Sequence, residues 1–118
     1  MSAINDAKYV IRNEYSSKHH MCVSFINQGT AHTYLNNIKH AFESYKQFLN
    51  VQEIKQIDRI IYTTDMLNEL NQDLLRDYKF IDSIRELILD SFSEKEVSEI
   101  RRKVSSQWVA ILSPPIAS

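Results

Sequence analysis

Glycine and proline are almost absent from this chain of 118 residues, and their scarcity constrains the fold more than any other feature. The sequence has one glycine, Gly29, and two prolines, which are the adjacent Pro114 and Pro115. Sandwiches and barrels of β-strands use many such residues in their turns. Phosphate-binding loops need glycine so that the backbone can approach the phosphate closely. The scarcity argues against both classes and favours a mostly helical protein.

The composition is that of an ordinary globular protein. Hydrophobic residues make up 43% of the chain and charged residues 25%, which is enough apolar surface to build a core. The length fits one domain. We therefore predict an all-α fold with a single domain, a bundle of four or five amphipathic helices over residues 1–112, followed by a C-terminal tail over 113–118.

Apolar residues recur at steps of three and four along most of the sequence, which is the period of a helix. A first helix is expected over about 3–28, with Gly29 after it in the left-handed conformation that often ends helices. A second helix is expected over 31–49. Its apolar stripe consists of Ala31, Tyr34, Leu35, Ile38, Ala41, Phe42, Tyr45, Phe48 and Leu49.

The middle of the chain predicts two further helices. Asn50, followed three residues later by Glu53, resembles a capping pair and predicts a helix over 51–62. The β-branched and capping residues Thr63-Thr64-Asp65 allow either a kink in one long helix or a break, and we favour a break, after which a helix would run over 65–91. The apolar residues of this region include Ile54, Ile57, Ile61, Leu67, Leu70, Ile84 and Ile88.

The strongest start signal lies near the C-terminus. Ser93 and Glu96 have the spacing of a capping box, and Phe92 and Val97 occupy the two positions of a hydrophobic staple. A final helix is expected to follow, and Ser113-Pro114-Pro115 should end it because proline cannot continue the helical hydrogen bonds.

Charge and cysteine content bear on the cellular compartment of the protein and on its partners. The 14 basic and 15 acidic side chains give a net charge of -1, whereas nucleic-acid binders usually have a basic excess. The single Cys22 cannot form an internal disulfide, and the first residues do not resemble a signal peptide. No apolar window reaches the roughly 18–20 residues of a membrane span. We expect a cytoplasmic protein with no membrane contact, and nucleic acid is an unlikely partner.

His32 and Asn36 lie in the stretch Ala31-His32-Thr33-Tyr34-Leu35-Asn36-Asn37-Ile38. On a helix their side chains would lie one turn apart, away from the apolar stripe. The stretch resembles the phosphoacceptor helix of some sensor histidine kinases and, more faintly, the start of histidine-phosphotransfer domains. This resemblance implies a phosphotransfer module with His32 as phosphoacceptor and Asn36 as a positioning group. It implies a relay rather than a kinase, because the sequence contains no ATP-binding domain.

A second resemblance involves Arg12 and His19. They are seven positions apart, or about two helical turns, and Asn13 follows the arginine. The Arg-x6-His pattern resembles the active-site motif of the HEPN ribonucleases, which are small helical dimers. The resemblance implies RNA cleavage with His19 as general base and Arg12 as the phosphate-binding group.

Metal ligation is the weakest of the chemical hypotheses. His19, His20 and Cys22 offer ligand atoms, but a zinc site needs three or four ligands and no matching pair lies nearby in sequence. Cys22 falls on the apolar stripe, so we expect a buried thiol. No metal and no cofactor are predicted.

Apolar residues exceed what one stripe per helix requires, notably in Ile60-Ile61-Tyr62 and Leu87-Ile88-Leu89. Such a surplus suggests a partner surface or a homodimer. We therefore expect a non-enzymatic module that binds another protein through an exposed helix face, as an adaptor, inhibitor, immunity factor or regulatory subunit. The candidate contact residues are the aromatic Tyr62, Tyr78, Phe80 and Trp108 and the acidic Asp73 and Asp77. Phosphotransfer and RNA cleavage remain the alternatives.

Overall fold

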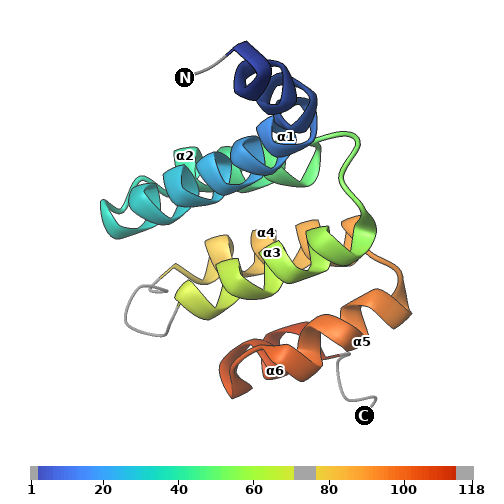
Figure 1. The fold of residues 1–118 in the computed structure, drawn as a ribbon. Helices are drawn as coiled ribbons and strands as arrows, with labels where there is room; N and C mark the ends of the chain where they lie inside the picture. The colour runs from blue at the N-terminus through green and yellow to red at the C-terminus, as the bar shows by residue number, and fades with distance from the viewer. Residues whose placement is uncertain (1–2, 71–76, 114–118) are drawn as a thin grey trace.

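The structure is a computed structural model that describes residues 3–70 and 77–113, and within these ranges it describes side chains from Ser17 onward. The described residues form helices and no strand (Figure 1), so the predicted all-α fold is confirmed. There are six helices in this part of the chain: α1 (Ala3–Tyr34), α2 (Ile38–Leu49), α3 (Gln56–Glu69), α4 (Tyr78–Ser91), α5 (Glu94–Lys103) and α6 (Ser106–Leu112).

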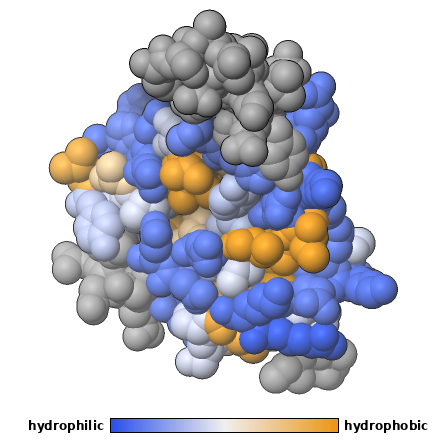
Figure 2. Space-filling view, in the orientation of Figure 1, coloured by the Kyte–Doolittle hydropathy of each residue, from blue (hydrophilic) through white to orange (hydrophobic). Residues whose placement is uncertain are grey.

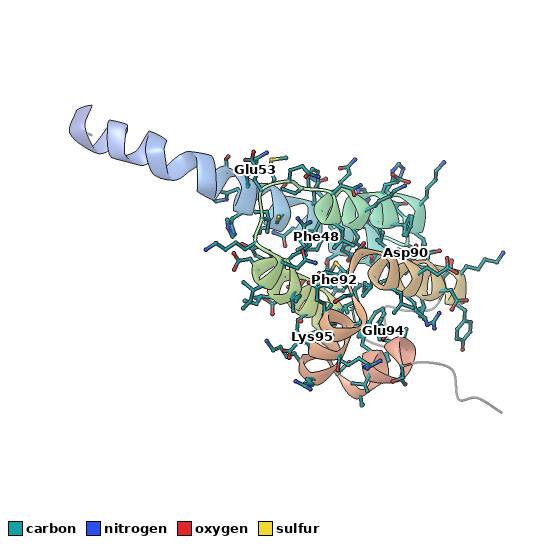
Figure 3. All side chains as sticks on the ribbon, turned by 90° about the vertical axis from the view of Figure 1, so that its right-hand side faces the viewer. Phe48, Glu53, Asp90, Phe92, Glu94 and Lys95 are labelled. Atoms are coloured by element: carbon teal, nitrogen blue, oxygen red, sulfur yellow. The ribbon has the colours of Figure 1, made fainter. Side chains whose placement is uncertain are left out.

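The helices are arranged in two layers. α1, α3 and α5 lie side by side in one layer, and α2, α4 and α6 form the layer behind it (Figures 1 and 3). α3 packs against both α1 and α5, and α4 packs against both α2 and α6. Each helix runs opposite to the one before it (Figure 1), and α1 packs against α2 and α5 against α6. The first turns of α1 extend past both layers (Figure 3).

The first hairpin turns at Asn36 rather than at the glycine. Asn36 has a φ of 61°. Its N–H donates to the Thr33 carbonyl at 3.0 Å, and the N–H of Asn37 donates to the His32 carbonyl at 2.8 Å. These bonds form a Schellman motif, in which asparagine takes the left-handed position that glycine usually occupies. The predicted helix over 31–49 is therefore wrong at its start, although its end is confirmed.

Gly29 lies within α1, where it is buried, and it does not have a positive φ. Its predicted role as a helix end is wrong. A Cβ atom on Gly29 would lie 2.4 Å from Cε1 of Tyr45 on α2. The Tyr45 hydroxyl also forms a hydrogen bond of 3.0 Å with Oγ1 of Thr30. Glycine is needed here because α1 must approach the Tyr45 ring closely.

A loop, rather than a new helix, follows α2. The N–H of Asn50 bonds to carbonyls in the last turn of α2, so Asn50 ends that helix and does not begin the next. The predicted capping pair with Glu53 is wrong, and Glu53 instead adopts a φ of 64°. The guanidinium of Arg59 fixes the loop by donating to the carbonyls of Leu49, at 2.6 Å, and Val51, at 2.8 Å.

Thr63 and Thr64 do not break their helix. Both are buried, and each hydroxyl donates to the carbonyl four residues earlier, at 2.8 Å. These bonds satisfy the hydroxyls inside the helix. The predicted boundary between helices over 51–62 and 65–91 is therefore wrong. α4 starts instead after Asp77, whose Oδ1 accepts from the N–H groups that follow it, and the predicted end of that helix is confirmed.

The capping box at the start of α5 is confirmed. The Glu96 N–H donates to Ser93 Oγ at 3.2 Å, and the Ser93 N–H donates to Glu96 Oε1 at 2.8 Å. The single final helix predicted after it is wrong, because the chain breaks between α5 and α6. The Asn68 amide of α3 spans this break: its Nδ2 donates to the Lys103 carbonyl and its Oδ1 accepts from the Ser105 N–H, both at 3.0 Å.

The core lies between the two layers and contains large aromatic side chains. The Tyr45 ring stacks on Phe80 with centroids 6.5 Å apart, and burial raises the pKa of the Tyr45 hydroxyl. Trp108 is fully buried, and its Nε1 donates to the Leu70 carbonyl at 2.8 Å. This bond satisfies the indole N–H and ties α6 to the end of α3.

Candidate interaction surface on helix α3

Large apolar side chains are exposed at several places on the described surface. Figure 2 shows that those on one face form separate areas among hydrophilic residues. The exposed set consists of Met21, Val23, Tyr34, Leu35, Ile57, Ile61, Tyr78 and Leu89. Tyr34 and Leu35 were predicted on an inward stripe and are exposed because the turn at Asn36 ends the helix beside them.

Ile57 and Ile61 stand out because they lie one turn apart on the outward face of α3. Ile57 is 65% exposed and Ile61 is 45% exposed. Asp65 and Asn68 continue the same face and are also exposed. The opposite face is buried through Thr63, Thr64, Met66 and Leu67. An outward helix face normally carries polar side chains. We refer to Ile57 and Ile61 together as the α3 apolar pair.

The sequence places Ile57 and Ile61 in one apolar series with Ile54, but the structure separates them from it. Both residues fit a helical period with Ile54, but Ile54 is buried in the loop before α3 and does not belong to the helix. The positions within α3 alone distinguish its two faces. The buried residues Thr63 and Met66 lie about half a turn around the helix from Ile57 and Ile61.

Tyr62, a predicted contact residue, lies next to the α3 apolar pair and is half-buried. Its ring meets Phe48 edge to face, with centroids 6.2 Å apart and planes at 89°. Its hydroxyl shares a hydrogen bond with Nδ1 of His19 on α1. These contacts fix the ring and tie α3 to α1, so Tyr62 offers a partner only part of its surface.

The other aromatic candidates separate into two groups. Phe80 is 2% exposed and Trp108 is fully buried. Both are core residues, and the prediction that they contact a partner is wrong for this fold, since neither ring reaches the surface. Tyr78 is 82% exposed at the first position of α4. It remains a candidate contact residue.

The structure describes only one of the two acidic residues predicted to contact a partner. Asp73 lies outside the described residues. Asp77 caps α4, where its Oδ1 accepts from the N–H of Lys79 at 2.9 Å and of Phe80 at 3.3 Å. A carboxylate at this position stabilises the start of a helix, so the sequence signal at Asp77 is explained by capping.

His32 and Asn36 do not share a helix face. Asn36 occupies the left-handed turn after α1, while His32 lies in the last turn of that helix. The His32 ring packs against His40 of α2, with centroids 5.3 Å apart, and its Nδ1 is buried without a hydrogen-bond partner. The arrangement expected of a phosphoacceptor and its positioning group is therefore absent from this turn.

Arg12 and His19 both belong to α1, but the side chain of Arg12 lies outside the described part. His19 is half-buried, with Nδ1 bonded to Tyr62 and Nε2 buried. A general base acting on RNA needs a ring nitrogen that the substrate can reach. The geometry at His19 does not favour that role.

Cys22 is fully buried, and desolvation raises the pKa of its thiol. The expectation of a buried thiol is confirmed, and a thiol of this kind is a poor nucleophile and metal ligand. Among the described residues, no cluster of three or more His, Cys, Asp or Glu side chains could hold a metal ion.

Comparison with known proteins gives no relative: no protein family, curated protein or solved structure matches this chain. Over residues 3–70 and 77–113, no helix combines the length and apolar composition that crossing a membrane requires.

Proposed function

We propose that this chain works by binding another protein through the α3 apolar pair. One observation supports the proposal most directly: Ile57 and Ile61 place two branched apolar side chains one turn apart on the outward face of the central helix of a layer. Two anchors at this spacing are typical of helix faces that bind an apolar groove or a second helix.

The energetics favour a contact of this kind. Burying apolar surface is worth roughly 25 cal/mol per Å², and Ile57 and Ile61 together leave much of their side chains in water. Tyr62 lies beside them with its ring already fixed by Phe48 and His19. A fixed ring loses little conformational entropy on binding, so it would contribute at the edge of the contact. The partner surface we propose is an apolar groove or the apolar face of a helix.

Photo-crosslinking tests the proposal. The photoreactive residue p-benzoylphenylalanine would replace Ile57 in one variant and Leu35 in another, each expressed in the native cell. Leu35 is a matched control because it is 70% exposed and lies in the turn after α1. We expect a covalent adduct of defined mass from position 57 and none from position 35. Mass spectrometry of the adduct would identify the partner.

A second variant shows whether the adduct depends on the apolar pair. Ile61→Lys should abolish the adduct at position 57, whereas Leu35→Lys should leave it unchanged. Both variants should keep the wild-type melting temperature, because both positions are exposed. An adduct between two copies of this chain would contradict binding to another protein, and so would an adduct that persists in Ile61→Lys.

A further inference from the structure

A second feature, separate from the α3 apolar pair, is a hollow where α4, α5 and the end of α6 meet. Its volume is about 430 Å³, which lies within the range of small-molecule sites. Leu89, Phe92, Val97 and Leu112 supply its apolar lining. Figure 3 shows Phe92 at the junction of α4 and α5, where the chain passes from one layer to the other.

Two arginines line the same hollow. Arg85 on α4 donates from Nε to the Ile111 carbonyl at 3.0 Å, and Arg101 on α5 donates from Nη1 to the Leu112 carbonyl at 3.2 Å. Both side chains are half-buried. These bonds fix each guanidinium through one nitrogen, so the other N–H groups of each guanidinium remain available to a ligand.

The charge of the hollow is not balanced within the described residues. The ion pair formed by the described residues joins Arg102 to Glu99, which lie outside the hollow, and neither Arg85 nor Arg101 forms an ion pair with a described residue. Among the described residues of the lining, Glu94 is the one carboxylate, and it is exposed at the first position of α5. Two guanidiniums against one exposed carboxylate give the described lining a net positive charge beside its apolar side chains.

We propose that this hollow binds a small amphiphilic carboxylate, such as a medium-chain fatty acid. The carboxylate would accept from the guanidiniums of Arg85 and Arg101, which suit planar two-oxygen groups. The alkyl chain would cover Leu89, which is 37% exposed, and would contact the buried Phe92 beneath it. The positive charge of the lining favours a carboxylate over a neutral amphiphile of the same length. The site is independent of the α3 apolar pair, so either proposal can fail without the other.

Titration with octanoate tests the proposal, with 1-octanol as a neutral probe of equal chain length. The readout is the methyl NMR shifts of Leu89, Val97 and Leu112 in the full chain. We expect saturable shifts at these methyls and an affinity for octanoate about ten-fold above that for 1-octanol, as a charge-assisted contact provides. Equal affinity for the two probes, or shifts that never saturate, would overturn the proposal.

Two variants locate the site. Leu89→Glu puts a carboxylate one turn from Arg85, where it would occupy the guanidinium, and we expect octanoate binding to weaken about ten-fold. Leu35→Glu adds the same charge in the turn after α1 and should bind octanoate like the wild type. Arg101→Gln should also weaken binding, but it removes a bond to the end of α6. Because Leu89 is partly exposed, Leu89→Glu should fold like the wild type, and a loss of binding in this variant would not result from unfolding. Unchanged binding in Leu89→Glu would contradict the site.

Discussion

The ring of Tyr45 occupies the space that any side chain on Gly29 would need. A Cβ atom there would lie 2.4 Å from Cε1 of Tyr45, and the ring is fully buried with Phe80 stacked on it. We expect Gly29→Ala to destabilise the fold by about 1–3 kcal/mol through overpacking, although alanine is the better helix former. Urea denaturation of the two proteins measures the difference.

The Tyr45→Leu background is the control for this prediction. A smaller side chain removes the clash, so Gly29→Ala should then be neutral or stabilising, by up to about 1 kcal/mol. An equal loss of stability in both backgrounds would show that Gly29 is needed for a reason other than Tyr45.

Asn36 should behave as a turn residue. Because its φ is 61°, Asn36→Gly should leave the free energy of unfolding unchanged or raise it slightly. Asn36→Ala should lower it by about 1 kcal/mol, since alanine has a Cβ atom but lacks the short polar side chain that helps asparagine adopt the left-handed conformation. Thermal denaturation of both variants shows whether Asn36→Gly is more stable than Asn36→Ala. If alanine were tolerated as well as glycine, the left-handed turn would not be the reason for asparagine here.

The capping box at Ser93 should give a defined pH dependence. The hydrogen bond from the Ser93 N–H lowers the pKa of the Glu96 carboxyl. Folding therefore favours the ionised carboxylate. This contribution is fully present above the unfolded pKa of about 4.3, and it is lost as the pH falls through the lower pKa of the folded protein.

Glu96→Gln isolates this contribution, because glutamine can take the same cap position without titrating. The wild type should be more stable than the variant at neutral pH, and the difference should shrink as the pH falls below the folded pKa. Denaturation at a series of pH values measures it. A difference that stays constant with pH would contradict the assignment. Ser93→Ala, which removes the other half of the box, should cost about 1 kcal/mol.

Asn68 should control the junction between α5 and α6. Asn68→Ala removes the bonds to the Lys103 carbonyl and the Ser105 N–H, and we expect a loss of about 1 kcal/mol because water can replace them at this exposed site. Hydrogen exchange at the Ser105 amide should become faster. Asn68→Asp keeps the acceptor for Ser105 and should retain more of that protection. Equal exchange in wild type and Asn68→Ala would contradict the role.

The sequence predicted the helical class and the capping box at the start of α5, whereas the other predicted capping pair, Asn50 and Glu53, was wrong. Ser93 and Glu96 interact within one turn, so their spacing was sufficient evidence. Gly29 and Asn50 were misread for different reasons. Gly29 is explained by the packing of Tyr45, a contact distant in sequence. Asn50 is explained by local bonds to the last turn of α2, because asparagine suits the end of a helix as well as its start.

The candidate surface was predictable only in part. Tyr62 and Tyr78 reach the surface, whereas Phe80 and Trp108 are buried, and a periodic pattern does not reveal which of two apolar faces meets another helix. Ile57 was grouped with the buried Ile54 because the true start of α3 was not visible in the sequence. The break before α6 depends on the amide of Asn68, which lies 35 residues before Lys103.

The alternation of helices between two layers also bears on how fast the chain folds. Most contacts in the described part of the chain join residues that are near in sequence, and chains of this type fold rapidly. The slower events should be the long closures, such as the one that joins Trp108 to the Leu70 carbonyl. Docking of α6, reported by the fluorescence of the single tryptophan, would then be among the last steps of folding.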